Sequence, residues 1–160
     1  MNKFETMSQD NLEQEKNQLI SQLGSSLHEE WRAPRKKEDG SFEPRWKSTN
    51  DKNWIAEHNT NEVDIANTVY DDLPSDWKGE NEISAKVAIG EIYEAINNNQ
   101  ELDDNFIENA SDVMHEKWLE RNGSWAPAEQ NKPYAELSEE EKEKDRVIIK
   151  KAIELYQSSK

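Results

Sequence analysis

The chain has 160 residues, of which 32% are apolar and 34% are charged, and its formal net charge is −15. This length allows one ordinary domain or two small ones, and so acidic a chain is not a general nucleic-acid binder, because neutralising phosphates requires a basic surface. The lack of cysteine excludes disulfide bonds and thiolate metal sites.

Six Trp, four Tyr and three Phe offset the polar composition. Each aromatic side chain can bury roughly 150–250 Å², so we expect a small, aromatic-rich core rather than a disordered chain. The polar first residues do not resemble a signal peptide, and no apolar run in the sequence approaches the length of a membrane span. The expectation is a cytoplasmic protein without a membrane segment.

Residues 1–10 carry no periodic pattern and are predicted to be flexible. A helix is predicted from Asp10, as its N-cap, to the residues before Pro34. The segment Gly24-Ser25-Ser26 could interrupt this helix. Its apolar positions recur at roughly helical spacing, at Leu12, Leu19, Ile20, Leu23 and Leu27.

A Gly-Ser-aromatic-x-Pro segment follows at 40–44, and the same pattern recurs at 123–127. Each is predicted to be a turn that leads into a brief extended piece. The two pieces could pair as a minimal sheet. The first is followed by an additional segment, 45–69, whose Trp46 and Trp54 either cover the other half of the chain or line a pocket.

Three further helices are predicted downstream. The first is capped by Ser75 and buries Trp77, Ile83, Val87, Ala88, Ile92 and Ile96. The second begins at Asp103 or Asp104, ends at a left-handed Gly123, and buries Phe106, Ile107, Ala110, Val113, Met114 and Trp118. The third begins with a capping box formed by Ser138 and Glu141, and it buries Val147, Ile148, Ala152, Ile153 and Tyr156.

Three sequence blocks of the second half recur in the same order in the first half. His-Glu-x-Trp occurs at 28–31 and 115–118, Gly-Ser-aromatic-x-Pro at 40–44 and 123–127, and Tyr-x-x-Leu at 70–73 and 134–137. The offsets are 87, 83 and 64 residues, so the copies differ mainly in their connections.

The predicted fold is therefore mainly α with short β-strands, a tandem pseudo-two-fold repeat of helix, short extended segment and helix. The first copy is predicted at 11–96, with the insertion at 45–69. A polar linker at 97–103 separates it from the second copy at 104–157.

The second copy resembles the ryanodine-receptor repeat, a small module found in tandem pairs in calcium-release channels and in stand-alone bacterial and phage proteins. The residues that carry the resemblance are His115-Glu116-Lys117-Trp118, Gly123-Ser124-Trp125, Pro133-Tyr134-Ala135-Glu136-Leu137 and Glu141-Lys142-Glu143-Lys144-Asp145-Arg146. The first copy keeps His28, Trp31, Gly40, Tyr70 and Leu73, but Phe42 replaces the second Trp and the insertion intervenes.

The resemblance implies a tandem domain of helices with short strands, and it implies no catalytic signature and no cofactor. In the channels, such a pair is associated with nucleotide-type ligands. Stand-alone prokaryotic versions look like sensors or binders of nucleotide-derived signals in conflict systems. A phage-encoded member would act in the host cytoplasm, for example against host defence.

His28 and His115 lie three residues before Trp31 and Trp118, on the same helical face as these rings. They could contact a ligand or act as general acid and base. We favour a structural role, in which each imidazole bonds backbone at the turn of its copy. A metal site is disfavoured, because the sequence contains no His-Glu-x-x-His motif.

Trp31, Trp118 and Trp125, together with Trp46 and Trp54 of the insertion, are an unusual stock of flat rings for so polar a chain. A planar base could stack between two of them, at roughly 1–3 kcal/mol per base. The alternative is that the rings fill the core. Core packing is favoured for Trp31 and Trp118, and neither role is favoured for Trp46 and Trp54.

Arg35, Arg45 and Arg121 are candidate phosphate ligands, because a guanidinium group binds phosphate in a bidentate manner and also stacks on Trp. The alternative is that the Arg-rich segment 32–37 is only a solvated basic turn. The acidic clusters at 71–72 and 139–141 are explained by their position at predicted helix starts.

The leading hypothesis is a non-enzymatic module that binds a nucleotide-derived ligand between the two copies, and that senses or sequesters it. The base would stack on Trp rings and the phosphate would meet Arg35, Arg45 or Arg121. The alternative is a protein-interaction or inhibitor module that uses exposed rings on an acidic surface. A third reading is a nucleotide hydrolase that works through His28 or His115. A homo-oligomer is left open.

Overall fold

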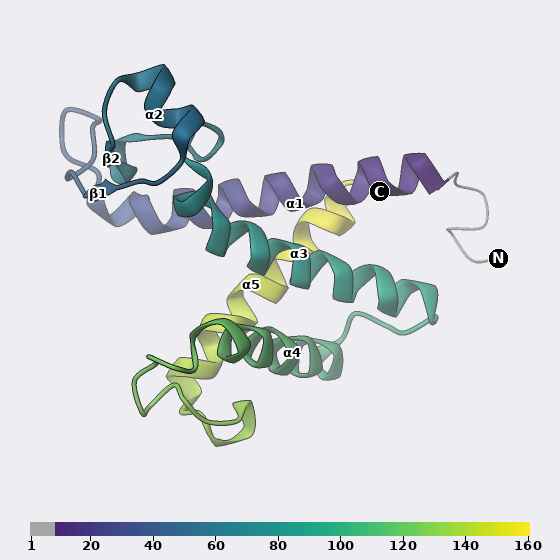
Figure 1. The fold of residues 1–160 in the computed structure, drawn as a ribbon. Helices are drawn as coiled ribbons and strands as arrows, with labels where there is room; N and C mark the ends of the chain where they lie inside the picture. The colour runs from purple at the N-terminus through teal and green to yellow at the C-terminus, as the bar shows by residue number, and fades with distance from the viewer. Residues whose placement is uncertain (1–8) are drawn as a thin grey trace. The chain divides into compact units, whose positions relative to one another are not determined.

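The computed structural model describes residues 9–160 as five α-helices, a two-stranded sheet and single 3₁₀ turns (Figure 1). The helices are α1 (Gln9–Arg32), α2 (Lys52–His58), α3 (Ser75–Asn97), α4 (Asp104–Asn122) and α5 (Glu139–Ser158). The strands are β1 (Trp46–Ser48) and β2 (Glu62–Asp64). The predicted class, mainly α with short strands, is confirmed, whereas residues 1–8 of the predicted flexible N-terminus lie outside the described residues.

The chain divides into two compact units. The central unit is Ser21–Ile83, and the terminal unit combines the described residues up to Ile20 with Ser84–Lys160. Helices α1 and α3 each continue across the division. The predicted copies at 11–96 and 104–157, the linker at 97–103 and the pseudo-two-fold relation stay predictions, because they rest on sequence similarity rather than on packing.

Helix α1 runs without interruption through Gly24-Ser25-Ser26. Gly24 serves close packing, because a Cβ at this position would lie 2.5 Å from the hydroxyl oxygen of Tyr70. The helix begins at Gln9, so Asp10 lies in its first turn and is not the predicted N-cap.

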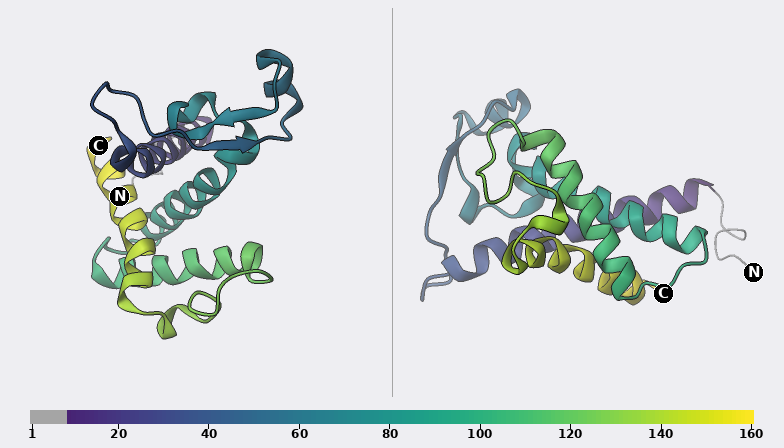
Figure 2. Two further views of the ribbon diagram at one scale, coloured as in Figure 1. Left: turned by 90° about the vertical axis from the view of Figure 1, so that its left-hand side faces the viewer. Right: turned by 90° about the horizontal axis from the view of Figure 1, so that it is seen from below.

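The sheet lies entirely within the insertion 45–69, where β1 and β2 pair antiparallel with Lys47 opposite Val63 (Figure 2). Asp64 fixes this local pairing, because its Oδ1 accepts hydrogen bonds from the backbone N of Arg45 (2.8 Å) and of Ala66 (3.2 Å). The prediction that the two Gly-Ser-aromatic-x-Pro segments pair with each other is therefore wrong.

Those two segments instead make local contacts. In the first, Phe42 forms an isolated antiparallel bridge with Lys36. In the second, the backbone N of Ala126 donates to the carbonyl oxygen of Asn122, at 2.9 Å, and this closes a turn after α4. The predicted left-handed end of α4 is also wrong, because Gly123 has a right-handed φ of −60°.

The helix starts follow capping chemistry. As predicted, Asp103 accepts a hydrogen bond from the backbone N of Phe106 at the start of α4, and Ser138 accepts one from that of Glu141 at the start of α5. The return bond of the predicted capping box is not made, because the Glu141 carboxylate accepts from Lys144 and Gln130 instead. Ser75 is not the predicted cap of α3. Its backbone N donates to Asp51, which brings the segment before α2 to the start of α3 within the central unit.

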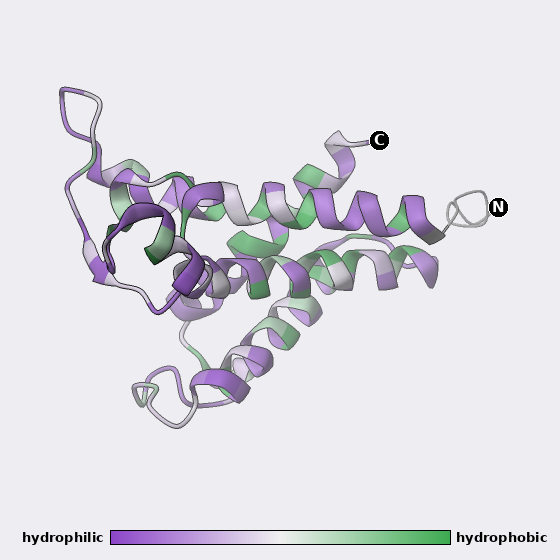
Figure 3. Ribbon diagram, turned by 45° about the horizontal axis from the view of Figure 1, so that its top comes forward, coloured by the Kyte–Doolittle hydropathy of each residue, from purple (hydrophilic) through white to green (hydrophobic). Residues whose placement is uncertain are grey.

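Apolar side chains, most of them on the α-helices, form the core of each unit. Hydrophilic residues prevail along much of the ribbon (Figure 3). Two predicted core residues, Trp77 and Val147, are exposed. Val147 is exposed because, at 100° per residue, it lies on the side of α5 opposite the buried Ile149, Ala152, Ile153 and Tyr156. Trp77 is held at the surface by its indole N–H, which donates to the carbonyl oxygen of Ser48 at 2.8 Å.

In the terminal unit, the ends of three helices meet around Tyr93 of α3. Its ring packs edge-on against Tyr156 of α5, with 5.5 Å between centroids, and its hydroxyl donates to Glu15 of α1. Burial raises the pKa of Tyr93, and the hydrogen bond to Glu15 adds to this effect. None of the helices in residues 9–160 combines the length and apolar character needed to cross a bilayer.

Candidate functional site

His28 fastens the end of α1 to the turn that leads into α3. It is only 3% exposed, and its Nε2 lies 2.7 Å from the carbonyl oxygen of Thr68. A carbonyl oxygen only accepts, so Nε2 carries a proton and donates. Arg32 Nη1 donates to the same oxygen, at 3.2 Å.

His115 makes the same contact in the terminal unit. It is buried on α4, and its Nε2 donates to the carbonyl oxygen of Lys132 at 2.7 Å. Each imidazole thus bonds backbone just before a 3₁₀ turn, Tyr70–Asp72 in one case and Tyr134–Glu136 in the other. This is the structural role favoured for both histidines from the sequence.

A small open pocket lies beside His28 in the central unit. The ring of Trp31 stacks on the imidazole, with 5.8 Å between centroids and 18° between planes. The pocket has a volume of about 170 Å³. We call it the Trp31 pocket, and its lining residues are His28, Trp31, Ile65, Leu73, Trp77, Glu80 and Asn81.

A second pocket, of about 140 Å³, lies beside His115 in the terminal unit. Here Trp118 stacks on the imidazole, with 6.1 Å between centroids and 14° between planes. We call it the Trp118 pocket, and its lining residues are His115, Trp118, Gln130, Leu137, Glu141, Lys144 and Asp145.

The two pockets are lined from corresponding sequence positions. The His and Trp of one pocket lie 87 residues before those of the other. Four further lining residues lie 64 residues before their counterparts, and the first of them is the Leu of the Tyr-x-x-Leu block. These pairs are Leu73 and Leu137, Trp77 and Glu141, Glu80 and Lys144, and Asn81 and Asp145. The correspondence is what a duplication requires, although the pseudo-two-fold relation itself stays a prediction.

Asp145 is the electrostatic feature that distinguishes the Trp118 pocket. Burial raises its pKa to about 6, and the charges of His115 and Lys144 only partly oppose this effect. Lys144 is engaged elsewhere, because its Nζ lies 3.1 Å from Glu141. Within residues 9–160, the Asp145 carboxylate has neither a hydrogen-bond donor nor an ion-pair partner.

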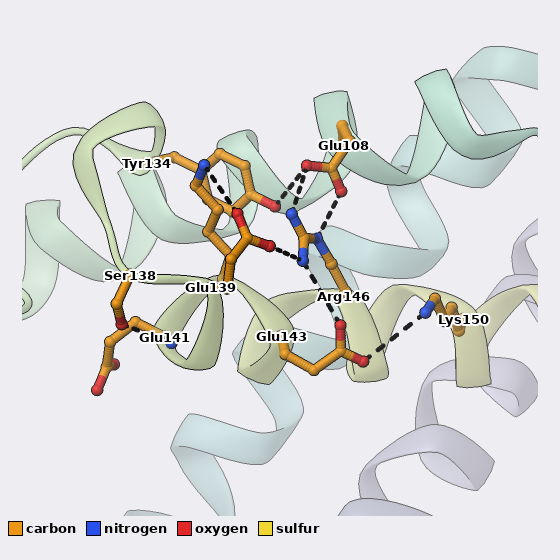
Figure 4. Close-up of polar contacts among 9 residues, drawn as sticks. Glu108, Tyr134, Ser138, Glu139, Glu141, Glu143, Arg146 and Lys150 are labelled. Carbon is orange, nitrogen blue, oxygen red and sulfur yellow. Dashed lines mark hydrogen bonds and ion pairs between the residues drawn. The ribbon is translucent and has the colours of Figure 1, made fainter.

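Arg146, the residue after Asp145, is the centre of a polar network (Figure 4). Its guanidinium binds Glu108 of α4 through two bonds, at 2.7 and 2.9 Å, and Glu139 at 2.8 Å. The hydroxyl of Tyr134 donates to the same Glu108, at 3.1 Å. The hydrogen bond from Arg146 lowers the pKa of Glu108. This network joins α4, α5 and the 3₁₀ turn before Leu137.

Two larger grooves are acidic. One, of about 660 Å³ in the central unit, is lined by four carboxylates, Asp51, Glu57, Asp71 and Asp72, and by no Lys or Arg. Trp54 borders it, but this ring is buried, stacks on His58 at 3.9 Å, and donates through Nε1 to the carbonyl oxygen of Asp72. Trp54 therefore acts mainly as core.

The other groove, of about 490 Å³, lies where α3 connects to α4 in the terminal unit. Its charged lining residues are Glu91, Glu94, Glu101 and Asp103. Burial raises the pKa of Glu91, and the charge of Glu94 adds to this effect. Within the described part of the chain, no group of three or more His, Asp or Glu side chains is arranged to hold a metal ion.

The structure brings some of the predicted ligand residues together and separates others. In the central unit the guanidinium of Arg35 lies 4.4 Å from the ring centre of Trp31. In the terminal unit Trp125, 64% exposed, meets Trp118 edge-on at 5.9 Å. Trp46 is 63% exposed on β1 and lines neither His-Trp pocket.

The remaining two candidate phosphate ligands are Arg121 and Arg45. Arg121 Nη1 donates to the carbonyl oxygen of Lys117 on its own helix, at 3.0 Å. Arg45 is exposed beside β1, and its backbone N, not its side chain, makes the contact with Asp64.

Sequence reasoning missed Asn81 and Asp145 as pocket residues. A signal was present, because each lies eight residues after the Leu of its Tyr-x-x-Leu block. On a helix, residues four, seven and eight positions apart share one face. The block offset pairs Asn81 with Asp145, and the periodicity places each on the same helical face as a residue four positions earlier, Trp77 or Glu141.

Comparison with known proteins adds no assignment to this geometry. The chain matches no protein-family model, no curated protein and no solved structure. The resemblance to the ryanodine-receptor repeat therefore stays a prediction that rests on the three sequence blocks.

Proposed function

We propose that the protein is a non-enzymatic binding module for a nucleotide-derived small molecule, whose base enters a His-Trp pocket. The supporting observation is that one kind of pocket, with an imidazole stacked on an indole, occurs in both units at corresponding positions. A flat aromatic wall with a polar group nearby suits a planar ring, which it binds by stacking and orients by hydrogen bonding.

The size of the pockets fits a ring rather than a whole nucleotide. Sites that enclose a complete drug-sized ligand typically measure roughly 300–1,000 Å³, whereas these pockets measure about 140 and 170 Å³. The base would be held in the pocket, and the sugar and phosphate would lie outside it.

Arg35 is the best placed of the three predicted phosphate ligands. Its guanidinium stacks on Trp31, and within residues 9–160 it has no carboxylate partner. A stacked guanidinium keeps its N–H edge available for phosphate. The two acidic grooves, in contrast, would repel a phosphate.

A binding role accords with the hydrogen bonds that His28 and His115 make to backbone carbonyl oxygens. The Nε2 proton of each is used to hold a backbone carbonyl, so neither ring offers that proton to a substrate. Binding without turnover would allow the protein to sense or sequester a nucleotide signal, as an anti-defence protein of a phage could. The location of the ligand between the two copies stays a prediction.

The test is a thermal-shift screen followed by calorimetric titration with nucleoside monophosphates, cyclic nucleotides and ADP-ribose. A ligand at 100 times its dissociation constant stabilises the native state by about 2.7 kcal/mol. The ligand should be recovered intact by chromatography. Trp31→Leu and Trp118→Leu should weaken binding, whereas Trp46→Leu, which removes an exposed ring outside both pockets, should not. Conversion of the ligand, or equal effects of all three variants, would contradict the proposal.

A second candidate function is protein interaction, and the exposure of Trp46 and Trp125 favours it. Large exposed aromatic side chains are enriched in binding surfaces. Under this alternative, nucleotides give no thermal shift, and a partner captured by the parent protein is lost with Trp46→Ala or Trp125→Ala. The variants Trp31→Leu and Trp118→Leu would then serve as controls.

A further inference from the structure

We propose that Asp145 makes the Trp118 pocket selective for a ring that presents two adjacent N–H donors, as the pairing edge of guanine does. This inference rests on the proposed function and names the ligand class of one of its pockets. It follows from the hydrogen-bonding capacity of the residues that line the pocket.

The first step concerns what the pocket can accept and donate. An ionised carboxylate has two acceptor oxygens and no donor. Within the described residues the Asp145 carboxylate has no partner, so both oxygens are available to a ligand.

The second step concerns the neighbouring polar groups, which are already engaged. The Nζ of Lys144 pairs with Glu141, and the Nε2 of Gln130 donates to the same carboxylate at 3.3 Å. The Nε2 proton of His115 is held by the carbonyl oxygen of Lys132. Lys144, Gln130 and His115 thus each direct an N–H to a protein acceptor, and Asp145 is the lining carboxylate whose oxygens no described residue uses.

The third step is discrimination between bases. Guanine presents a ring N–H and an amino group side by side, and two such donors match the two oxygens of one carboxylate. Adenine and cytosine present an amino group beside a bare ring nitrogen, which would face a carboxylate oxygen without a proton between them. A buried polar atom left without a partner costs free energy, so these bases bind less well.

The burial of Asp145 strengthens the preference. The raised pKa, about 6, reports the cost of keeping an unpaired charge away from water. A ligand with N–H donors relieves this cost, whereas a ligand with acceptors increases it.

The Trp31 pocket provides an internal comparison, because Asn81 occupies the position that corresponds to Asp145. An amide offers one acceptor and a donor group. That combination matches the amino group and ring nitrogen of adenine. The two pockets are thus expected to prefer different bases.

The experiment is titration of the full chain with GMP, IMP and AMP in a Trp31→Leu background, which leaves the Trp118 pocket as the site. GMP should bind more tightly than IMP, which lacks the amino group, and IMP more tightly than AMP. Asp145→Asn should weaken GMP binding by about tenfold or more, the scale of one bidentate base contact, and it should not weaken AMP binding. Asp112→Asn, which changes an exposed carboxylate on α4 outside the pocket lining, is the matched control and should have no effect.

A gain-of-function variant gives a second readout that does not depend on the folding of Asp145→Asn. Asn81→Asp, in a Trp118→Leu background, should raise the affinity of the Trp31 pocket for GMP relative to AMP. If GMP binds to the parent but neither Asp145→Asn nor Asn81→Asp changes the GMP-to-AMP ratio, the inference fails and the proposed function stands. If no nucleotide binds to the parent, both fail.

Discussion

Gly24 of α1 lies against the phenol of Tyr70, so that a Cβ on residue 24 would approach the hydroxyl oxygen to 2.5 Å and the adjacent ring carbon to 2.6 Å. Tyr70 is buried and belongs to the 3₁₀ turn that leads into α3. The ring cannot swing into solvent without leaving the core of the central unit. Close approach of this helix to the turn therefore depends on a residue without a side chain.

Gly24→Ala should destabilise the protein by roughly 1–3 kcal/mol, the usual cost of overpacking a core. Chemical denaturation followed by circular dichroism measures the change. The matched control is Gly79→Ala on α3, where a Cβ would meet nothing within 4 Å. This substitution should be neutral or stabilising by about 0.4–1 kcal/mol. Equal effects of the two variants would show that helix propensity, and not contact with Tyr70, governs position 24.

The contacts of His28 and His115 with backbone carbonyls predict a structural role for both. His115→Ala should destabilise the protein by roughly 1–3 kcal/mol, because the part-buried carbonyl of Lys132 loses the donor from His115. His28→Ala should cost less, because Arg32 Nη1 still donates to the carbonyl oxygen of Thr68. His58→Ala is the comparison, because His58 is exposed and its Nδ1 bonds a carbonyl of its own short helix. This variant loses the ring contact with Trp54 but no bond between separate elements. A stability equal to that of the parent in both variants would contradict this role.

Asp145 predicts an unusual dependence of stability on pH. Its pKa in the folded protein, about 6, is above the ordinary 3.8, so the folded state holds this proton more tightly than the unfolded chain does. Ionisation of Asp145 consequently costs stability above pH 6, and the cost disappears as the pH falls through this range. Asp145→Asn should stabilise the protein at pH 7 by roughly 1–3 kcal/mol.

The charged groups that face Asp145 are His115 on α4 and Glu141 and Lys144 on α5. The difference between the parent and the variant at each pH removes the contributions to stability that do not involve Asp145. Denaturation at pH 7 and pH 5 should show the stabilisation by Asp145→Asn shrinking at the lower pH. A difference that stays constant, or grows, would mean that the carboxylate is not held in an unfavourable environment.

The hydrogen bonds between Arg146 and Glu108 predict that stability falls as the pH is lowered below about 4.5, the opposite of the effect of Asp145. The hydrogen bond from Arg146 lowers the pKa of Glu108 below its ordinary 4.5. The stability that this pair contributes is present above pH 4.5 and is lost as the pH falls through the lowered value. Arg146→Met should therefore destabilise the protein at neutral pH and flatten the loss of stability below pH 4.5.

Lys117→Met is the matched control for Arg146→Met. The Lys117 ammonium pairs with Glu120 at 3.9 Å on the exposed face of α4, and such exposed pairs contribute little, typically about 0–1 kcal/mol. The control should leave acid unfolding, measured by fluorescence, almost unchanged. If it acts as strongly as Arg146→Met, general surface charge and not the network determines acid sensitivity.

The helices could be predicted from the sequence because their apolar residues recur at helical spacing and their starts carry capping side chains, as at Asp103 and Ser138. The sheet could not, because its strands are three residues long and contain a single buried residue, Val63. Their pairing depends on the carboxylate of Asp64, a contact across the chain that no local pattern reveals.

The candidate site was only partly predictable. The His-Trp pairs follow from helical spacing, because residues three apart share a face. The core position of Trp54 does not, since it involves the hydrogen bond of the Trp54 indole to the carbonyl oxygen of Asp72, 18 residues along the chain. The raised pKa of Asp145 results from burial, and burial cannot be predicted from the pattern of charged residues along one helix.

The division of the chain has a consequence for synthesis on the ribosome. The central unit, Ser21–Ile83, is continuous in sequence, so its residues are all available once residue 83 has emerged from the ribosome. The terminal unit is not, because Glu15 of α1 bonds Tyr93 of α3 and Lys160 at the end of the chain. Domains generally fold as units and the N-terminal ones fold first. The central unit should therefore fold during translation. The first turns of α1 should make all their contacts in the terminal unit only after Lys160 has been synthesised.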